Sequence, residues 1–169
     1  MLLPLAITFV VILGLLIIPG KTVAPLVFTS KGTQKRLFAL INLKPKQTFI
    51  DLGCGRGNLL VTAAKHYGAK AIGYEISPLA YLWSKTNALF SGRHQNIRVY
   101  LADFNHASFP TAAVVYFFLL PKGIAKLAPK LKILPAGTRI VSNTWPIAGW
   151  TPMQVESSNP SAPLYLYQL

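Results

Sequence analysis

Three of the four acidic residues of this chain come at the ends of segments that we predict to be β-strands. Asp51 lies near the end of a predicted strand at residues 48–52, Glu75 closes one at 71–75, and Asp103 comes just after one at 97–101. In an open parallel sheet, ligands bind beyond the carboxyl ends of the strands, where the chain turns into the following helices. Three carboxylates at that edge indicate a ligand with hydroxyls and amines that can donate hydrogen bonds to them.

A glycine-rich loop follows the first of these strands. It reads Asp51-Leu-Gly-Cys-Gly-Arg-Gly, so the glycines at 53, 55 and 57 allow the backbone to approach a ligand closely. The dinucleotide fingerprint G-x-G-x-x-G would require glycine or alanine at position 58, where this chain has Asn58. The spacing therefore disfavours a nicotinamide dinucleotide.

Alternating strand and helix signals predict the elements that position these residues. The predicted strands are residues 48–52, 71–75, 97–101, 112–118, 139–143, 153–156 and 163–167, and the predicted helices are 30–42, 58–67, one after Ser77, and 122–132. The pattern predicts an α/β fold, a Rossmann-like three-layer sandwich on a mostly parallel seven-stranded sheet that ends in an antiparallel hairpin.

Two prolines mark the ends or the interior of predicted helices. Ser77 and Pro78 provide an N-cap and a first-turn proline for a helix that carries Leu79, Leu82 and Trp83 on one face. Pro129 is expected to shorten or kink the helix predicted at residues 122–132.

The composition of the chain limits its class. Its 169 residues suit one compact domain, and 52% hydrophobic residues are too many for a disordered basic tail. Lys and Arg number 17 against 4 Asp and Glu, a net charge of +13 that favours anionic partners such as nucleic acid or acidic phospholipid. Cys54 is the only cysteine and the three histidines lack metal-ligand spacing, so we expect no disulfide framework and no metal site.

The N-terminus has the character of a membrane segment. Residues 1–19 contain no charge, and an uncharged stretch of about 18 to 20 residues just crosses a hydrocarbon core of about 30 Å. We expect a transmembrane helix at residues 1–20, a basic juxtamembrane segment with the first helix at 21–46, and the main domain at 47–169. The alternative is a helix that lies on the membrane or is buried in the protein. Basic residues between 21 and 46 predict that the domain is cytoplasmic and contacts anionic membrane lipids.

The glycine loop and the acids together resemble the first motifs of class I, seven-β-strand methyltransferases, whose cofactor is S-adenosylmethionine. This resemblance covers about residues 47–169. It implies that Asp51 and the loop residues bind the methionine end of the cofactor, and that Glu75 accepts both ribose hydroxyls. It also implies that adenine is covered by Ile76, accepted by Asp103 and bound by the Phe104 amide. The implied cofactor-binding set is Asp51, Gly53, Cys54, Gly55, Gly57, Glu75, Ile76, Asp103 and Phe104.

Three further stretches resemble membrane-associated protein-lysine methyltransferases, of the kind that modify ADP/ATP translocase or a membrane component of ATP synthase, and their prokaryotic relatives. They are Gly73-Tyr-Glu-Ile-Ser-Pro-Leu-Ala-Tyr-Leu-Trp-Ser, Val115-Tyr-Phe-Phe-Leu-Leu-Pro and Thr144-Trp-Pro-Ile-Ala-Gly-Trp-Thr-Pro. Many of those relatives have Gly-Asp where this chain has Gly55-Arg56. The resemblance implies a protein substrate in or near the membrane.

Methyl transfer from a sulfonium depends mainly on positioning the nucleophile and excluding water. Aromatic residues at the ends of the fourth and fifth strands, namely Tyr116, Phe117, Phe118 and Trp145, are therefore candidates to line an acceptor channel. Among them Phe118 and Trp145 are the catalytic candidates. Glu156 is predicted to be a strand-face carboxylate.

Alternative functions remain open from the sequence. A phospholipid amine is one other acceptor, because an anchor and a basic surface both suit it. RNA is another, favoured by the net charge, although the Asn/Asp-Pro-Pro-aromatic motif of adenine-N6 enzymes is absent where Leu119-Leu120-Pro121 stands. A non-catalytic scaffold that binds the cofactor and docks a partner is the alternative from another class.

Overall fold

The computed structural model describes residues 29–169. The expected helix at residues 1–20 lies outside these residues. Within 29–169, none of the helices has both the length and the hydropathy needed to cross a membrane.

A single seven-stranded sheet forms the centre of the described structure. Its strands are β1 (Thr48–Leu52), β2 (Lys70–Glu75), β3 (Ile97–Leu101), β4 (Val114–Phe117), β5 (Arg139–Asn143), β6 (Gln154–Glu156) and β7 (Leu164–Gln168). The strand order is β3-β2-β1-β4-β5-β7-β6. The first five strands are parallel, while β7 pairs antiparallel with both β5 and β6. The mostly parallel sheet and the C-terminal antiparallel hairpin are thus confirmed.

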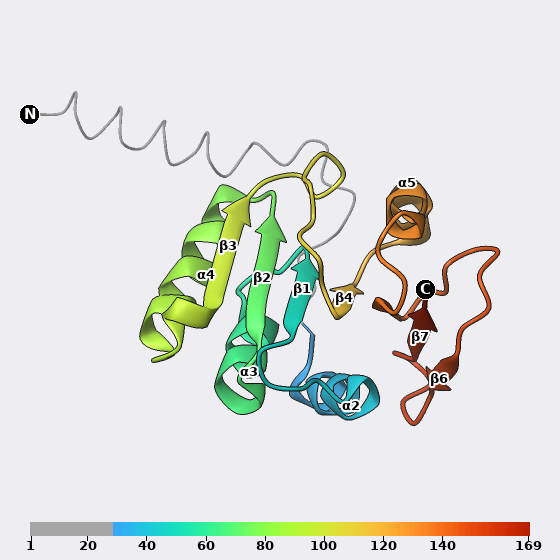
Figure 1. Ribbon diagram of the computed structural model, residues 1–169, viewed down its shortest axis with the longest axis horizontal. Coiled ribbons are helices and arrows are strands. Elements are labelled where there is room, and N and C mark those ends of the chain that lie inside the picture. Colours follow the sequence, from blue (N-terminus) through green and yellow to red (C-terminus); the bar gives the residue numbers. More distant parts are fainter. Residues whose placement is uncertain (1–28) are drawn as a thin grey trace, which may run out of the picture.

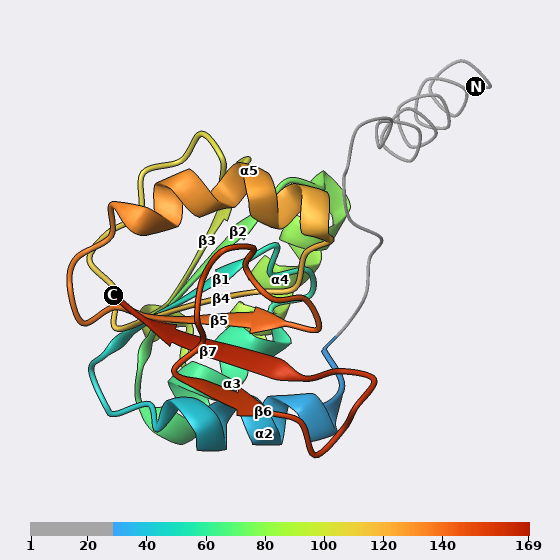
Figure 2. The same cartoon turned by 90° about the vertical axis from the view of Figure 1, so that its right-hand side faces the viewer.

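Helices cover both faces of the sheet, which confirms the three layers. They are α2 (Lys31–Ile41), α3 (Asn58–Tyr67), α4 (Pro78–Phe90) and α5 (Pro121–Lys132), with a short 3-10 helix η1 (His94–Asn96) before β3. Figure 2 shows α5 on one side of the sheet and α2 and α3 on the other. One hydrophobic core lies under α2, α3 and α4, and a second lies under α5. The connections β3–β4 and β5–β6 contain no helix, so α5 alone forms the second helical layer.

Local sequence signals explain where the helices begin. The Ser30 hydroxyl accepts a hydrogen bond from the Thr33 amide at 3.1 Å, and Ser77 caps α4 in the same way from Ala80. Pro129, however, does not shorten α5, which continues to Lys132. The carbonyl that loses its partner to this proline is that of Ala125, and both residues are exposed or partly exposed, so water can satisfy it.

Helix α4 turns its large apolar residues away from the sheet. The face predicted from the periodicity of Leu79, Leu82 and Trp83 is exposed, and the buried side consists of Ala80, Ser84 and Ala88. Small residues are required there because α4 approaches the glycine loop closely, and a Cβ atom at Gly57 would lie 2.3 Å from the Ser84 hydroxyl oxygen. Close helix packing, rather than apolar periodicity, therefore sets the orientation of α4.

Candidate active site

The three acids predicted to share one crevice all lie at the carboxyl edge of the sheet. Strands β1, β2 and β3 are parallel neighbours, and their arrowheads point to the same edge in Figure 1. Asp51 is in register with Gly73, and Glu75 with Leu101, the residue two before Asp103. This edge is therefore the candidate site.

The glycine loop between β1 and α3 needs glycine for its backbone conformation. Gly53, Gly55 and Gly57 have φ angles of 81°, 54° and 75°, in the left-handed region that other residues rarely adopt. The amides of Gly53 and Cys54 both donate to the carbonyl oxygen of Tyr74, at 2.8 and 3.1 Å. These bonds hold the loop across the end of β2.

The N-terminus of α3 opens onto the same edge. Its N-cap is Gly57, which has no side chain to cap the helix amides. The partial positive charge of a helix N-terminus stabilises an anion such as a carboxylate. The loop residue Cys54 is buried and its Sγ lies 3.8 Å from the Ser84 hydroxyl oxygen, so only its backbone is available to a ligand.

Glu75 is held rigidly between the loop and the start of α4. Its Oε2 accepts a hydrogen bond from the Gly55 amide and its Oε1 accepts one from the Ser77 amide, both at 2.8 Å. The side chain is buried, with 7% exposure. Each carboxylate oxygen can accept a second hydrogen bond, so the carboxylate can still bind a pair of ribose hydroxyls.

Asp51 is a buried carboxylate with a perturbed proton affinity. Desolvation, and in second place the neighbouring charge of Glu75, raises its pKa to about 8. A bound cation beside Asp51 would stabilise the ionised form. The ammonium group of the methionine part of S-adenosylmethionine has that charge, so the donor set of this edge fits the expected cofactor.

The predicted adenine-binding residues are less prearranged. Asp103 Oδ1 accepts hydrogen bonds from the amide and the side chain of Asn105, at 2.8 and 2.9 Å, and its Oδ2 lies 4.0 Å from His106 Nε2. The carboxylate thus turns toward its own loop. The carbonyl oxygen of Phe104 accepts from Lys130, while Ile76 is half exposed at the rim. Among the predicted set, the structure fixes Glu75 and the glycine loop most firmly.

A buried polar group that the sequence reasoning missed lies at the ends of β4 and β5. The Tyr116 hydroxyl accepts a hydrogen bond from Asn143 Nδ2 at 2.9 Å and lies 3.0 Å from the Thr29 hydroxyl. Burial raises the pKa of this tyrosine, so it stays neutral. Asn143 could have been found from the sequence, because it closes a predicted strand just as Glu75 does, but it is an amide and the prediction at strand ends covered only acids.

The aromatic residues predicted to line an acceptor channel have different positions. Phe117 belongs to the core under α5 and is fully buried, so it is not exposed to a ligand. Phe118 is partly buried and packs against the other core, whereas Trp145 is 41% exposed. Trp145 follows Thr144, a non-glycine residue with a φ angle of 71°. Such a strained residue at the end of a strand is typical of functional sites.

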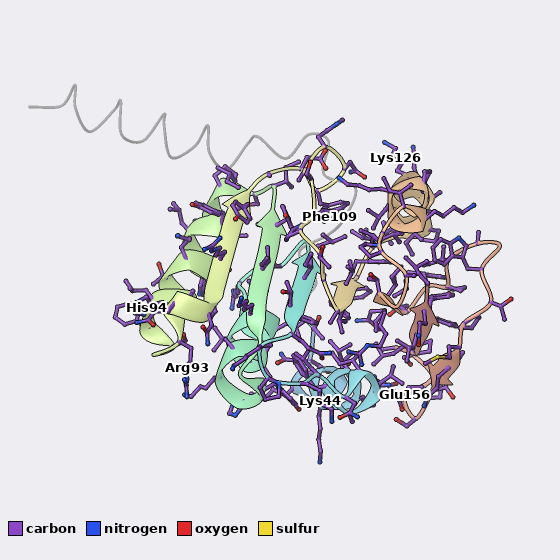
Figure 3. All side chains as sticks on the ribbon, in the orientation of Figure 1. Lys44, Arg93, His94, Phe109, Lys126 and Glu156 are labelled. Carbon is purple, nitrogen blue, oxygen red and sulfur yellow. The ribbon has the colours of Figure 1, made fainter. Side chains whose placement is uncertain are left out.

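Glu156 lies away from the candidate site. Figure 3 shows it on β6 beside α2, at the opposite side from the carboxyl ends of β1 and β2. It forms an ion pair with Arg36 of α2. Hydrogen bonds from Ser158, together with Arg36, lower the pKa of Glu156. Among the described residues, no cluster of three metal-ligating side chains occurs.

Comparison with known proteins places this geometry among methyltransferases. The family described as the ANTKMT methyltransferase domain matches residues 51–154. A protein-lysine N-methyltransferase of Saccharolobus islandicus (strain REY15A) is 33% identical over 148 residues, which cover 85% of this chain and 92% of that protein. An ATP synthase lysine N-methyltransferase of Mus musculus is 32% identical over 104 residues, which cover 61% of this chain and 42% of the mouse protein.

A solved structure agrees with these relatives in fold. The crystal structure of an RNA methyltransferase from Salinibacter ruber, in complex with S-adenosyl-L-homocysteine, matches with a TM-score of 0.80 and 29% identity. The match covers 84% of this chain and 93% of that one.

Proposed function

The chain belongs to the family of ANTKMT methyltransferase domains, and from that membership we propose that it methylates lysine side chains of a protein. It is an S-adenosylmethionine-dependent methyltransferase, and its cofactor supplies a methyl group carried on a sulfonium sulfur. Membership of an enzyme family disfavours a non-catalytic scaffold. The lysine acceptor is supported by the name of the archaeal relative, of whose length this chain covers 92%.

The arrangement that supports this function most directly is the contact between Glu75 and the glycine loop. Glu75 binds the ribose through its free lone pairs, the loop and the N-terminus of α3 bind the carboxylate of the methionine part, and Asp51 faces its ammonium group. These contacts position the cofactor at the carboxyl edge, where Trp145 and Phe118 exclude water on the acceptor side.

The acceptor amine loses its proton to water in this proposal. The three acids at the edge bind the cofactor, and Glu156 pairs with Arg36. A lysine amine has a pKa of about 10.4, which an apolar site beside a cationic cofactor lowers by desolvation and like charge. No side-chain base is therefore required.

Membrane attachment forms the second part of the proposal. The uncharged residues 1–19 anchor the chain, and the basic residues that follow them keep the domain on the cytoplasmic side. Carbonate washing of membranes tests this, because a spanning anchor resists it. Release by carbonate, but not by high salt, would show that the segment lies on the membrane instead.

Transfer of a labelled methyl group into membranes tests the acceptor. Membranes are incubated with the protein and labelled S-adenosylmethionine, and the label is separated into protein, lipid and RNA fractions. We expect methyl-lysine in the protein fraction, and no label with the Glu75→Ala variant. Label confined to lipid amines would contradict the proposal.

RNA is the second candidate acceptor. The net charge of +13 favours it, and so does the similarity to the Salinibacter ruber RNA methyltransferase. Label that is sensitive to ribonuclease would establish this acceptor in place of lysine.

A further inference from the structure

Helix α4 exposes a stripe of large apolar side chains. The apolar stripe consists of Leu79, Leu82, Trp83, Leu89 and Phe90, and Phe90 is 82% exposed. Residues separated by three, four, seven or eleven positions share a helix face, so these five side chains form one surface. A contiguous exposed apolar surface of this kind marks an interaction site.

Positive charge surrounds the apolar stripe. The Arg56 guanidinium lies 3.8 Å from the centre of the Trp83 ring, and Lys85 is exposed on α4 itself. Arg93 and His94 lie together beyond the end of α4, on the outer side of the molecule in Figure 3. Helix α4 contains no acidic residue.

A shallow groove continues the surface toward β3. It is lined by Lys85, Thr86, Ala88, Leu89, His94 and Ile97. Apolar side chains and basic groups alternate there, which suits a molecule with a hydrocarbon part and an anionic part. Phospholipids have this chemistry.

We propose that the apolar stripe of α4 docks on an anionic phospholipid bilayer. Its leucine, phenylalanine and tryptophan side chains enter the boundary between headgroups and acyl chains, and Arg56, Lys85 and Arg93 contact the phosphates. An interfacial helix has this combination of one apolar face with Trp, Phe and Leu and flanking basic residues. A second copy of the chain is disfavoured because two molecules with a net charge of +13 repel each other.

This inference does not require methyl transfer or the proposed anchor. It does set the orientation of the site, because α4 begins three residues after Glu75. Docking through α4 would hold the carboxyl edge of the sheet beside the membrane surface.

A polarity-sensitive fluorophore attached to cysteine tests the docking in the full chain. Phe90→Cys places the label in the apolar stripe, and Ala125→Cys places it on exposed α5 at the opposite face of the sheet. The native Cys54 is buried, so the introduced thiol reacts preferentially. The probe surfaces are vesicles of phosphatidylcholine with phosphatidylglycerol, compared with phosphatidylcholine alone.

Docking predicts that emission from the label at position 90 shifts to shorter wavelength with anionic vesicles and shifts less with neutral ones. The label at 125 should keep its aqueous emission. An aqueous label at 90 in vesicle-bound protein would overturn the proposal. So would a lipid-free shift at 90: if it grew with protein concentration a second copy would be the occupant, and if it did not, residues 1–28 would be.

Discussion

Glu75 joins the end of β2 to the loop after β1, because its carboxylate accepts a hydrogen bond from the Gly55 amide at 2.8 Å. Two parts of the cofactor site that are 20 residues apart in the sequence are thereby fixed relative to each other before any ligand binds. A site arranged in this way loses little conformational freedom on binding.

Replacing Glu75 by alanine should weaken binding of S-adenosylhomocysteine by roughly 1.5 to 3 kcal/mol, the typical value of hydrogen bonds to a charged group. Titration calorimetry measures the change. Glu156→Ala is the matched control, since that acid lies on β6 and pairs with Arg36. Equal affinities for the two variants would remove Glu75 from the site.

Asp51 should make the stability of the ligand-free protein depend on pH. Its pKa is about 8 in the folded state against 3.8 in the unfolded state, so the folded state binds more protons between these values. Stability is therefore full below about pH 4 and falls as pH rises toward 8, by at most about 1.4 kcal/mol per pH unit. Asp51→Asn should flatten this part of the profile in denaturant titrations. Parallel profiles for the two proteins would show that Asp51 is ionised throughout.

Gly57→Ala should destabilise the fold through two separate effects. The new Cβ would lie 2.3 Å from the Ser84 hydroxyl oxygen, and the residue would keep a φ angle of 75°. Gly92→Ala is the matched control, because its φ angle is 71° and no atom lies within 4 Å of its Cβ position. Each left-handed residue costs about 1 to 3 kcal/mol, and Gly57→Ala should exceed Gly92→Ala in a urea melt. If the two losses were equal, close packing of α4 on the loop would be disproved.

Trp145→Ala should lower turnover more than it lowers cofactor affinity, because this ring is expected to exclude water from the acceptor rather than to bind the cofactor. Phe118→Ala should act in the same direction. Met153→Ala, another exposed apolar residue, should change neither quantity. Methyl-transfer kinetics and calorimetry measure the two quantities separately. A loss of affinity as large as the loss of turnover would place Trp145 at the cofactor.

The rate of methyl transfer should rise with pH toward the lysine pKa, as the neutral amine fraction grows. Glu156→Gln should retain most of the activity along this whole profile, because its partner is Arg36 and not the acceptor. The loss in stability should be small, since a partly exposed ion pair contributes about 0 to 1 kcal/mol. A loss of about a hundredfold in turnover with intact cofactor binding would instead identify Glu156 as the base.

Local patterns in the sequence predicted the features that depend on short stretches of chain. Ser77 and Pro78 specify the start of α4, and three glycines within five residues specify a loop of left-handed conformations. The positions of Asp51 and Glu75 followed from a general rule, since parallel strands bring their carboxyl ends to one edge.

Only the tertiary structure decided which side chains meet across the sheet. The hydrogen bond between Asn143 and Tyr116 joins residues 27 positions apart, and Asp103 turns to Asn105 instead of toward the crevice. The outward orientation of Trp83 was equally undetermined, because α4 has small residues on one side and large apolar ones on the other. Periodicity shows that such faces exist. Which face is buried depends on the closeness of approach to Gly57, a distance that no local pattern contains.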